Sequence, residues 1–480
     1  MDQPQTQTRQ HVAILPSPGM GHVIPMVEFA KRFVRNHNFT VTFLVPTSGS
    51  PSTAMRSVFN GLPDSIEHVF LPPVNFDDLP EGSKLETRIA LTVVRSLASL
   101  RDALASLFSR RVGVVALVVD HFGLDAFDVA REFNLPSYLF YPSPAMVLSL
   151  ILHLPELDES TSSEYWELTD PVKIPGCFPI PGKDLLDPIQ DRKSDVYKLT
   201  LHKAKQYRLV DGIIVNTFND LEPRAISSLQ EREATEKLPR VYPVGPLAKI
   251  QRTNLTEEES QCLIWLDGQP RVSVLFISFG SGGTLSSDQT NELALGLENS
   301  EQRFLWVVRP PNDRAASAAY FKVNSQNESS FDFLPDGFLG RTRDRGLVVH
   351  SWAPQAQILS HSSIGGFLTH CGWNSILESM VNGVPMIVWP LFAEQRMNAF
   401  MLTEDIKVAL RPKASENGVV EREEIARVIK ALMEGGEDRE KLRKRIEELK
   451  EAGSTALTED GNSTKALADV ADVWKSQIRN

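Results

Sequence analysis

Short apolar runs and amphipathic helical patterns alternate along most of this chain, and the series occurs twice. Apolar runs of strand length that are separated by helical patterns predict parallel sheets with helices on both faces. The predicted strands of the first series are residues 11–15, 40–45, 114–119, 136–140 and 212–215, and those of the second are 272–278, 304–308, 347–349, 364–368 and 385–389.

A polar stretch separates the two series, and 480 residues suffice for more than one domain. We therefore predict an α/β fold of two doubly wound, Rossmann-like domains that face each other across a cleft. The expected N-terminal domain is residues 1–247, the linker is 248–261, the C-terminal domain is 262–458, and 459–480 form a last helix. Residues 312–336 are rich in Ala, Ser and Asn without periodicity, so we expect a mobile loop there.

One segment of the second series has the features of an anion trap. Residues 365–369 read as a buried strand, 370–372 as a turn and 373–381 as a helix. The start of such a helix presents free backbone N–H groups and the positive end of the helix dipole, which suit an anion. His370, Asn374 and Ser375 add side-chain donors at the same place. An ordinary turn with a polar helix cap is the alternative.

Residues on either side of this trap suit the rest of a nucleotide sugar. Trp352 offers a flat face for a base, and Gln355 follows closely. Glu378 shares a helix face with Asn374, where its carboxylate is able to accept two vicinal ribose hydroxyls. Glu394 and Gln395 come after the next strand, and an acid beside an amide suits the hydroxyls of a hexose.

Two residues at strand ends in the first series are candidates for acid–base chemistry. His22 follows the Pro/Gly loop after the first predicted strand, and Asp120 directly follows the strand 114–119. Ligands of open parallel sheets bind beyond these carboxyl ends. A histidine suits a general base near neutral pH, and a carboxylate stabilises the imidazolium that forms. The sequence predicts a His22–Asp120 pair, although each residue alone is compatible with a structural role.

Composition narrows the class of protein. The net charge of −11, from 50 Lys and Arg against 61 Asp and Glu, argues against a general nucleic-acid surface. The N-terminus lacks an apolar core, no apolar run reaches membrane-spanning length, and only three cysteines occur. We therefore expect a cytoplasmic enzyme with no membrane insertion, and a monomer because no coiled-coil pattern occurs.

The segment 352–395 resembles, over its full length, the donor-binding signature of plant secondary-product UDP-glycosyltransferases. SPGMGH (17–22), LVVDHFG (117–123), LDPIQDR (186–192) and SFGSGGT (278–284) extend the resemblance to both domains, towards the subgroup that glucosylates hydroquinone, monolignols and other simple phenols. The resemblance implies the GT-B fold, with the last helix packing back on the N-terminal domain. It also implies a direct, inverting displacement that gives a β-glucoside from UDP-glucose.

The resemblance also assigns roles to single residues. It implies His22 and Asp120 as the catalytic dyad. It implies binding of the UDP-sugar by Ser17, Ser281, Trp352, Ala353, Gln355, His370, Trp373, Asn374, Ser375, Glu378, Glu394 and Gln395. In the family that the chain resembles, a glutamine at the position of Gln395 goes with glucose more often than with galactose. The chain contains no Asp-x-Asp pair for a divalent metal, so we expect no cofactor, and the helix start beside His370 would stabilise the diphosphate.

The acceptor should be a small, flat, mostly apolar molecule bound by the N-terminal domain. We choose Ile89, His121, Phe122 and Ile151 as candidates for the wall of its pocket, with ordinary core packing as the alternative. Hydroquinone, coniferyl alcohol and indoxyl fit this class. The sequence leaves open which of them is used, and also the balance between O- and N-transfer.

Other functions fit less well. A nicotinamide oxidoreductase would need the third glycine of G-x-G-x-x-G, but Ile24 stands there. A UDP-sugar binding module without activity would be expected to lack His22 or Asp120. An epimerase or hydrolase would leave the apolar acceptor side without a role. A zinc site at His370–Cys371 lacks a second Cys/His pair near in sequence.

Overall fold

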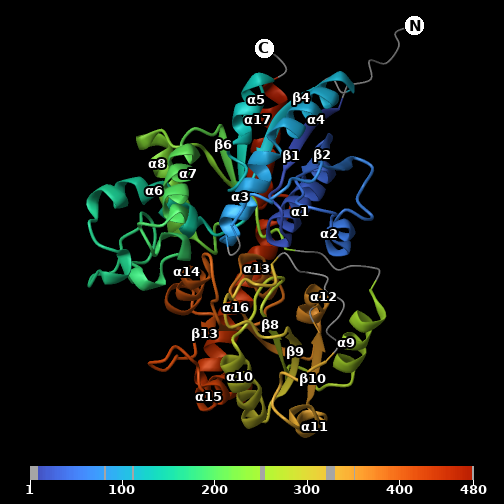
Figure 1. The fold of residues 1–480 in the computed structure, drawn as a ribbon, viewed down its shortest axis with the longest axis vertical. Helices are drawn as coiled ribbons and strands as arrows, with labels where there is room; N and C mark the ends of the chain where they lie inside the picture. Colours follow the sequence, from blue (N-terminus) through green and yellow to red (C-terminus); the bar gives the residue numbers. More distant parts are fainter. Residues whose placement is uncertain are drawn as a thin grey trace.

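The chain forms two parallel sheets, one in each half, each covered by helices on both faces (Figure 1). The structure is a computed structural model that describes residues 9–80, 83–110, 113–248, 255–320, 330–350 and 352–477. The two halves stack along the long axis of the molecule, with the carboxyl ends of both sets of strands near the junction. The predicted α/β class with two Rossmann-like domains is confirmed.

The N-terminal sheet has seven strands in the order β3-β2-β1-β4-β5-β6-β7. β1 lies between β2 and β4, with Ile14 opposite Phe43 and Val118. The loops that follow β1 and β4 therefore meet at one edge of the sheet. The strands are β1 (Gln10–Leu15), β2 (Phe39–Val45), β3 (Ile66–Phe70), β4 (Val114–Val119), β5 (Ser137–Tyr141), β6 (Gly212–Val215) and β7 (Val241–Pro243).

The C-terminal sheet has six strands in the order β10-β9-β8-β11-β12-β13. β8 is central, and it pairs with β9 on one side and β11 on the other. The strands are β8 (Val274–Ser278), β9 (Arg303–Val308), β10 (Gly346–His350), β11 (Ile364–Thr369), β12 (Met386–Val388) and β13 (Ala409–Leu410).

The helices of the N-terminal half are α1 (Met20–Asn36), α2 (Thr53–Val58), α3 (Leu85–Arg95), α4 (Leu97–Arg110), α5 (Ala126–Glu132), α6 (Ala145–Ser160), α7 (Asp195–Tyr207) and α8 (Pro223–Glu236). Those of the C-terminal half are α9 (Glu257–Asp267), α10 (Ser287–Ser300), α11 (Phe338–Thr342), α12 (Gln355–Ser360), α13 (Trp373–Val381), α14 (Gln395–Phe400), α15 (Arg422–Met433) and α16 (Glu437–Ala456). The last helix is α17 (Asn462–Ser476).

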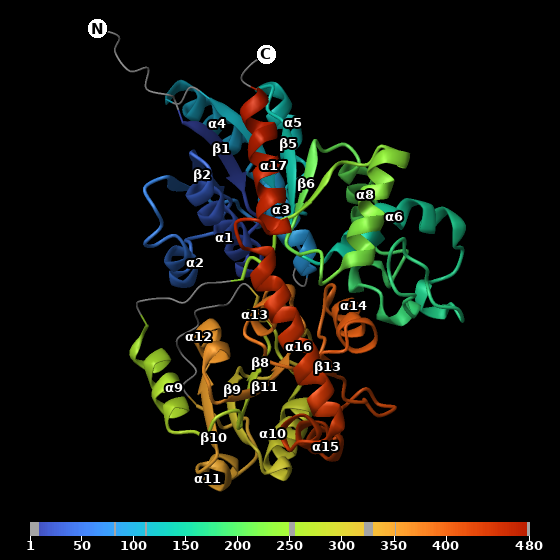
Figure 2. The ribbon, with the colours of Figure 1, turned by 180° about the vertical axis from the view of Figure 1, so that it is seen from behind.

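α17 follows the C-terminal half in sequence but packs on the N-terminal half (Figure 2). Its apolar stripe, Leu467, Val470, Ala471 and Trp474, joins the core cluster on one face of the N-terminal sheet. The Trp474 ring lies 5.0 Å from Phe33 and 5.2 Å from Tyr138, measured between ring centroids. The chain therefore crosses between the halves twice.

Three expectations about elements differ from the structure. The predicted linker, residues 248–261, overlaps α9, because Thr256 and Glu259 form a reciprocal capping box that starts this helix. The edge strand β3 was not predicted, since most of its residues are exposed and it lacks an apolar run. His22 was expected to follow the Pro/Gly loop, but α1 begins at Met20, so His22 lies in the first turn of this helix.

The expected loop 312–336 is described only at its two ends, and residues 321–329 lie outside the described part. Its first residues are hydrogen-bonded to the turn after β8. Asn312 donates its backbone N–H to Leu285 O at 2.8 Å, and Thr284 donates to Ala316 O at 2.8 Å. This segment therefore stays beside the carboxyl end of the C-terminal sheet.

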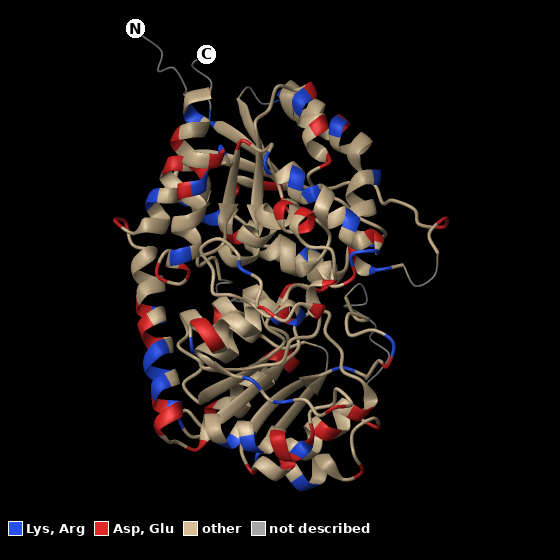
Figure 3. Ribbon diagram, turned by 90° about the vertical axis from the view of Figure 1, so that its left-hand side faces the viewer, with Lys and Arg blue, Asp and Glu red and all other residues tan. Residues whose placement is uncertain are grey.

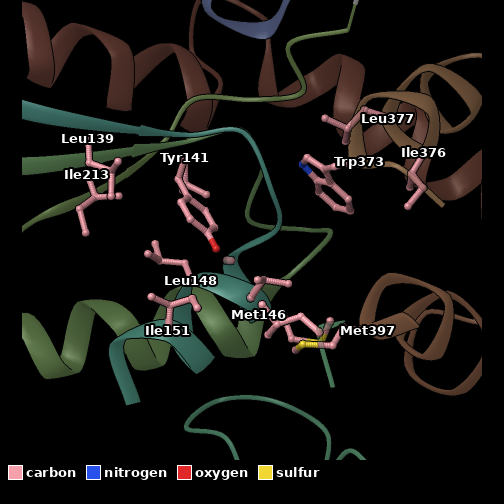
Figure 4. Packing of buried hydrophobic residues seen from close by; sticks show 14 of the residues in the cluster. Leu139, Tyr141, Met146, Leu148, Ile151, Ile213, Trp373, Ile376, Leu377 and Met397 are labelled. Atoms are coloured by element: carbon pink, nitrogen blue, oxygen red, sulfur yellow. The ribbon is translucent and has the colours of Figure 1, made fainter. Parts of the chain in front are cut away.

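A single hydrophobic cluster crosses the junction of the halves. Figure 4 shows Tyr141 and Ile151 of the N-terminal half in the same cluster as Trp373 and Met397 of the C-terminal half. Charged residues lie outside it, and Lys and Arg alternate with Asp and Glu along the outer helices in the view of Figure 3. Among the described residues, no helix combines the length and the apolar character needed to cross a membrane.

Candidate active site

A cavity of about 310 Å³ lies where the carboxyl ends of the two sheets face each other. The loops after β1, β4 and β5 supply one wall, and the loops after β8, β9, β11 and β12 supply the other. This is the position expected for ligands of open α/β sheets. The predicted residues that line it are His22, His121, Phe122, Ile151, Ser281, Trp352, Ala353, Gln355, His370, Trp373, Asn374, Ser375, Glu378, Glu394 and Gln395.

His22 lines the wall of this cavity, and Asp120 lies directly behind it. His22 Nδ1 is 3.0 Å from Asp120 Oδ2, and Asp120 is fully buried while the His22 side chain is 17% exposed. Burial favours the neutral imidazole, but the charge of Asp120, its hydrogen bond and the charge of Glu394 together raise the pKa of His22. Because Nδ1 faces Asp120, Nε2 is the nitrogen available to a ligand.

Asp120 is held by donors on its other sides. The backbone N–H of Ser17 donates to Oδ2 at 2.8 Å, the Ser17 hydroxyl donates to Oδ1, and the Phe122 N–H donates to Oδ1 at 3.1 Å. Burial alone would raise the pKa of Asp120. The charge of His22 and the hydrogen bonds from His22 and Ser17 outweigh burial and lower that pKa. The carboxylate is therefore ionised beside the imidazole.

Ser17 and Ile89 are not where the sequence predicts them to be. Ser17 is fully buried, it is absent from the cavity wall, and both its donors are engaged by Asp120 rather than by a phosphate position. Ile89 is also absent from the wall and packs behind Phe122 in a small apolar cluster. Ser17 lies against the buried Asp120 and Ile89 lies against the wall residue Phe122, and spacing in sequence does not show such a difference.

The predicted base- and ribose-binding residues form one hydrogen-bonded unit. Gln355, at the start of α12, donates from Nε2 to Ser375 Oγ at 3.0 Å and to Glu378 Oε2 at 2.8 Å. Trp352 and Ala353 lie on the cavity wall just before it. The carboxylate of Glu378 is thus fixed on the face of α13 that lines the cavity.

His370, just before α13, lies against two glycines. Gly372 caps the start of α13, and Gly280 lies in the turn after β8. A Cβ on Gly280 or on Gly372 would come within 2.5 Å of ring atoms of His370, so both positions need glycine. Burial, with a further contribution from the charge of Arg309, lowers the pKa of His370 to about 4. The imidazole is therefore neutral, and Nδ1 has no hydrogen-bond partner among the described residues. Such a buried nitrogen at a helix start suits an anionic ligand.

The start of α13 also ties the two halves together. The indole N–H of Trp373 donates to Asn216 O at 2.7 Å, and Asn374 Nδ2 donates to Gly21 O at 3.0 Å. The indole N–H of Trp373 is therefore already engaged within the protein. These contacts bring the start of α13 next to Gly21, the residue before His22.

Glu394 and Gln395 follow β12 and close the cavity. Gln395 Oε1 accepts from the backbone N–H groups of Leu391 at 2.9 Å and Phe392 at 3.0 Å. These two contacts fix the amide so that its Nε2 points away from the Leu391–Phe392 backbone. Ser143, from the N-terminal half, donates to Glu394 Oε1 at 3.5 Å. Burial raises the pKa of Glu394 above its ordinary value.

The acceptor-side wall is apolar with few polar groups. Phe122 packs edge-on to His22, with ring centroids 5.6 Å apart, and Ile151 lies on the same wall. His121 is hydrogen-bonded to the Tyr207 hydroxyl through Nδ1. Burial and the nearby charge of Lys203 lower the pKa of His121 to about 3, so its ring is neutral. His121 therefore adds no positive charge beside His22.

The sequence reasoning missed several wall residues, among them Glu86, Ser143, Arg309 and Tyr320. Ser143 and Arg309 follow the carboxyl ends of β5 and β9, so the rule that located His22 and Asp120 would have found them. Tyr320 had no such signal. Its hydroxyl occupies the space where Gly19 would carry a Cβ, which only the fold reveals. Within the described residues, no group of three or more His, Cys, Asp or Glu is placed to hold a metal ion.

Known proteins resemble this chain in sequence and in fold. The family model described as UDP-glucoronosyl and UDP-glucosyl transferase matches residues 256–436. A hydroquinone glucosyltransferase from Rauvolfia serpentina is 58% identical over 468 residues, which cover 98% of this chain and 98% of that protein.

Solved structures extend the likeness to both halves. A UDP-glucosyltransferase from Polygonum tinctorium capable of glucosylating indoxyl, in complex with 3,4-dichloroaniline, superposes with a TM-score of 0.90 at 52% identity. The superposition covers 98% of this chain and 100% of the Polygonum tinctorium chain. UGT2 from Phytolacca americana, complexed with UDP-2fluoro-glucose and pterostilbene, gives a TM-score of 0.87 at 50% identity, with 97% and 100% covered.

Proposed function

This chain belongs to the UDP-glycosyltransferase family, and we propose that it transfers glucose from UDP-glucose to small aromatic acceptors with inversion at the anomeric carbon. The observation that carries the proposal is the His22–Asp120 pair, 3.0 Å apart, with His22 on the wall of a cavity that is also lined by the predicted donor-binding residues other than Ser17. The relatives that act on hydroquinone and indoxyl support a small aromatic acceptor.

The donor would lie along the C-terminal half. Uracil would stack on Trp352. The ribose hydroxyls would donate to the carboxylate of Glu378, which Gln355 holds in place. The diphosphate would bind at the start of α13, near His370 and Ser281. Glu394 and Gln395 would bind hydroxyls of the glucose, close to His22.

The reaction would be a single displacement at the anomeric carbon. Nε2 of His22 removes the proton of the acceptor hydroxyl as its oxygen attacks C1, and the C1–O bond to the β-phosphate breaks. The electron pair of that bond stays on the phosphate oxygen, so UDP leaves as the anion. Asp120 stabilises the imidazolium that forms, as a carboxylate does in hydrolase triads. Attack opposite the leaving group converts the α-glucosyl donor into a β-glucoside.

No metal ion is part of this proposal. Neutral hydrogen-bond donors at the helix start and the imidazole of His370 would stabilise the leaving diphosphate. Such preorganised donors act most strongly in a site from which water is excluded.

The acceptor would bind against the N-terminal half. A flat ring would pack on Phe122 and Ile151, with its hydroxyl toward His22. The complexes of relatives with 3,4-dichloroaniline and pterostilbene support a flat aromatic acceptor and leave room for an amine as nucleophile. An amine needs less base assistance than a hydroxyl, so the position of His22 would set the balance between O- and N-transfer.

A competition assay tests the proposal. The protein would receive UDP-glucose and a mixed panel of hydroquinone, coniferyl alcohol, indoxyl, anilines and flavonols, with and without EDTA, and products would be identified by mass spectrometry. The expected result is addition of one hexose to one or a few small aromatics, unaffected by EDTA, with a β-anomer by NMR. Transfer to none of these acceptors, or an α-anomer, would contradict the proposal.

A further inference from the structure

Arg309 directly follows β9 and lines the cavity on the side of the C-terminal half. β9 pairs with β8 in register, so the residue after β9 lies beside the glycine-rich turn after β8. Arg309 lines the cavity together with Ser278, Ser281 and His370. Its Nη1 donates to Gly283 O, with the two atoms 3.4 Å apart. This contact holds the guanidinium at the turn.

The guanidinium remains a cation in this place. Burial lowers the pKa of Arg309 to about 10, which still leaves it protonated at neutral pH. Its field reaches the anion trap, because its charge contributes, after burial, to the low pKa of His370. A partly desolvated cation near a neutral imidazole adds positive charge close to the start of α13.

The proposed reaction places negative charge at this position. The diphosphate of UDP-glucose gains a further negative charge as the C1–O bond breaks. A neutral imidazole, hydroxyls and backbone N–H groups supply only dipoles against this charge. Guanidinium groups bind phosphate with two parallel hydrogen bonds, and a full charge is worth more to the leaving group than to the bound substrate.

We propose that Arg309 binds the diphosphate of the donor and stabilises the UDP leaving group. The inference rests on the proposed function, and it assigns to this chain a donor-binding residue that lies outside the segment 352–395. The alternative role for Arg309 is structural, to hold the turn after β8 through Gly283 O.

Nucleotide titrations separate the two roles. Uridine, UMP and UDP would be titrated by calorimetry into the wild-type protein and into Arg309→Met, Arg309→Lys and Arg303→Met. Arg303 is a matched control, because it begins the same strand at the end away from the cavity and donates to Gln269 Oε1 at 2.8 Å. Uridine reports the base and ribose subsites alone.

The expected result is a loss that depends on phosphate. Arg309→Met should weaken UDP binding by about tenfold to a hundredfold, the cost of one charge-assisted hydrogen-bonded contact. Uridine affinity should change by no more than about twofold, since no phosphate is present. Arg309→Lys should be intermediate, because lysine keeps the charge but not the bidentate geometry. Arg303→Met should behave as the wild type.

Two results would overturn the inference. Unchanged UDP affinity in Arg309→Met would mean that the guanidinium does not contact the diphosphate. Equal loss of uridine and UDP would mean that Arg309 acts only on the shape of the turn. Binding of UDP that depends on Arg309, without transfer to any acceptor, would refute the proposed transferase function and leave the role of Arg309 standing.

Discussion

At the scale of single residues, two Asp–His pairs among the described residues lie in different settings. His22 lines the cavity with Asp120 buried directly behind it, whereas His361 and Asp267, with Nε2 and Oδ1 3.1 Å apart, lie outside the cavity. Only the first carboxylate is fully buried and held by further donors from Ser17 and Phe122. The second pair therefore provides matched controls for substitutions in the first.

Replacing His22 by Ala should abolish most O-glucosylation. Loss of a general base typically costs about 10² to 10⁴ in rate, and kcat for a phenol should fall by this amount. UDP affinity should stay the same, because the ring faces the acceptor side. His361→Ala should keep full activity. Steady-state kinetics with hydroquinone check this, and full O-transfer by His22→Ala would show that His22 is not the base.

Asp120→Asn should change the pH dependence as well as the rate. The carboxylate raises the pKa of His22, so its removal lets burial lower that pKa, with Glu394 as the remaining acid. Transfer needs the neutral imidazole, so the acid limb of kcat/KM should move to lower pH. The maximal rate should still fall, because the imidazolium loses its partner. An acid limb that stays in place, as expected for Asp267→Asn, would contradict the assignment.

At the scale of elements, strands that carry site residues were the most predictable part. β4 and the start of α13 match the predicted residues because a buried apolar run is followed directly by a polar group. The edge strand β3 was not predicted, since most of its residues are exposed and its apolar pattern is weak. Tyr320 and the Trp373–Asn216 hydrogen bond depend on how separate elements pack, which periodicity along one element does not encode.

The turn after β8 yields a prediction about its glycines. Gly280 has φ of +70° and no space for a Cβ beside His370, whereas Gly61 has the same φ in open space. Both substitutions by Ala should cost about 1 kcal/mol of unfolding free energy from the left-handed backbone. Only Gly280→Ala should also displace the His370 ring and weaken UDP binding, by about tenfold. Calorimetric titration of both variants measures this, and equal UDP affinities would contradict it.

At the scale of the whole molecule, the pattern of alternating strands and helices was enough to predict two similar domains and the cleft between them. The predicted pairing of His22 with Asp120 needed only the rule that strand ends meet at one edge. The pattern could not predict which residues line the cavity wall and which residues lie behind that wall. Ser17 and Ile89 show this, because each lies one layer behind a predicted contact.

The return of the chain to the N-terminal half gives the last prediction, which concerns stability. Trp474 on α17 is fully buried against Phe33 and Tyr138, whereas Trp166 is 55% exposed. Trp474→Ala should lower the free energy of unfolding by about 3–5 kcal/mol, the usual cost of removing a large buried aromatic ring. Trp166→Ala removes the same side chain from the surface and should change it by no more than about 0.5 kcal/mol.

Urea denaturation followed by circular dichroism measures both variants, with the unfolding midpoint as the readout. UDP affinity near 25 °C separates local from global effects, because α17 contributes no residue to the cavity wall. If α17 only covers the surface of the N-terminal sheet, the two variants should have equal midpoints. If it is part of the core, as its contacts require, Trp474→Ala should unfold at lower urea and still bind UDP as the wild type does before unfolding begins.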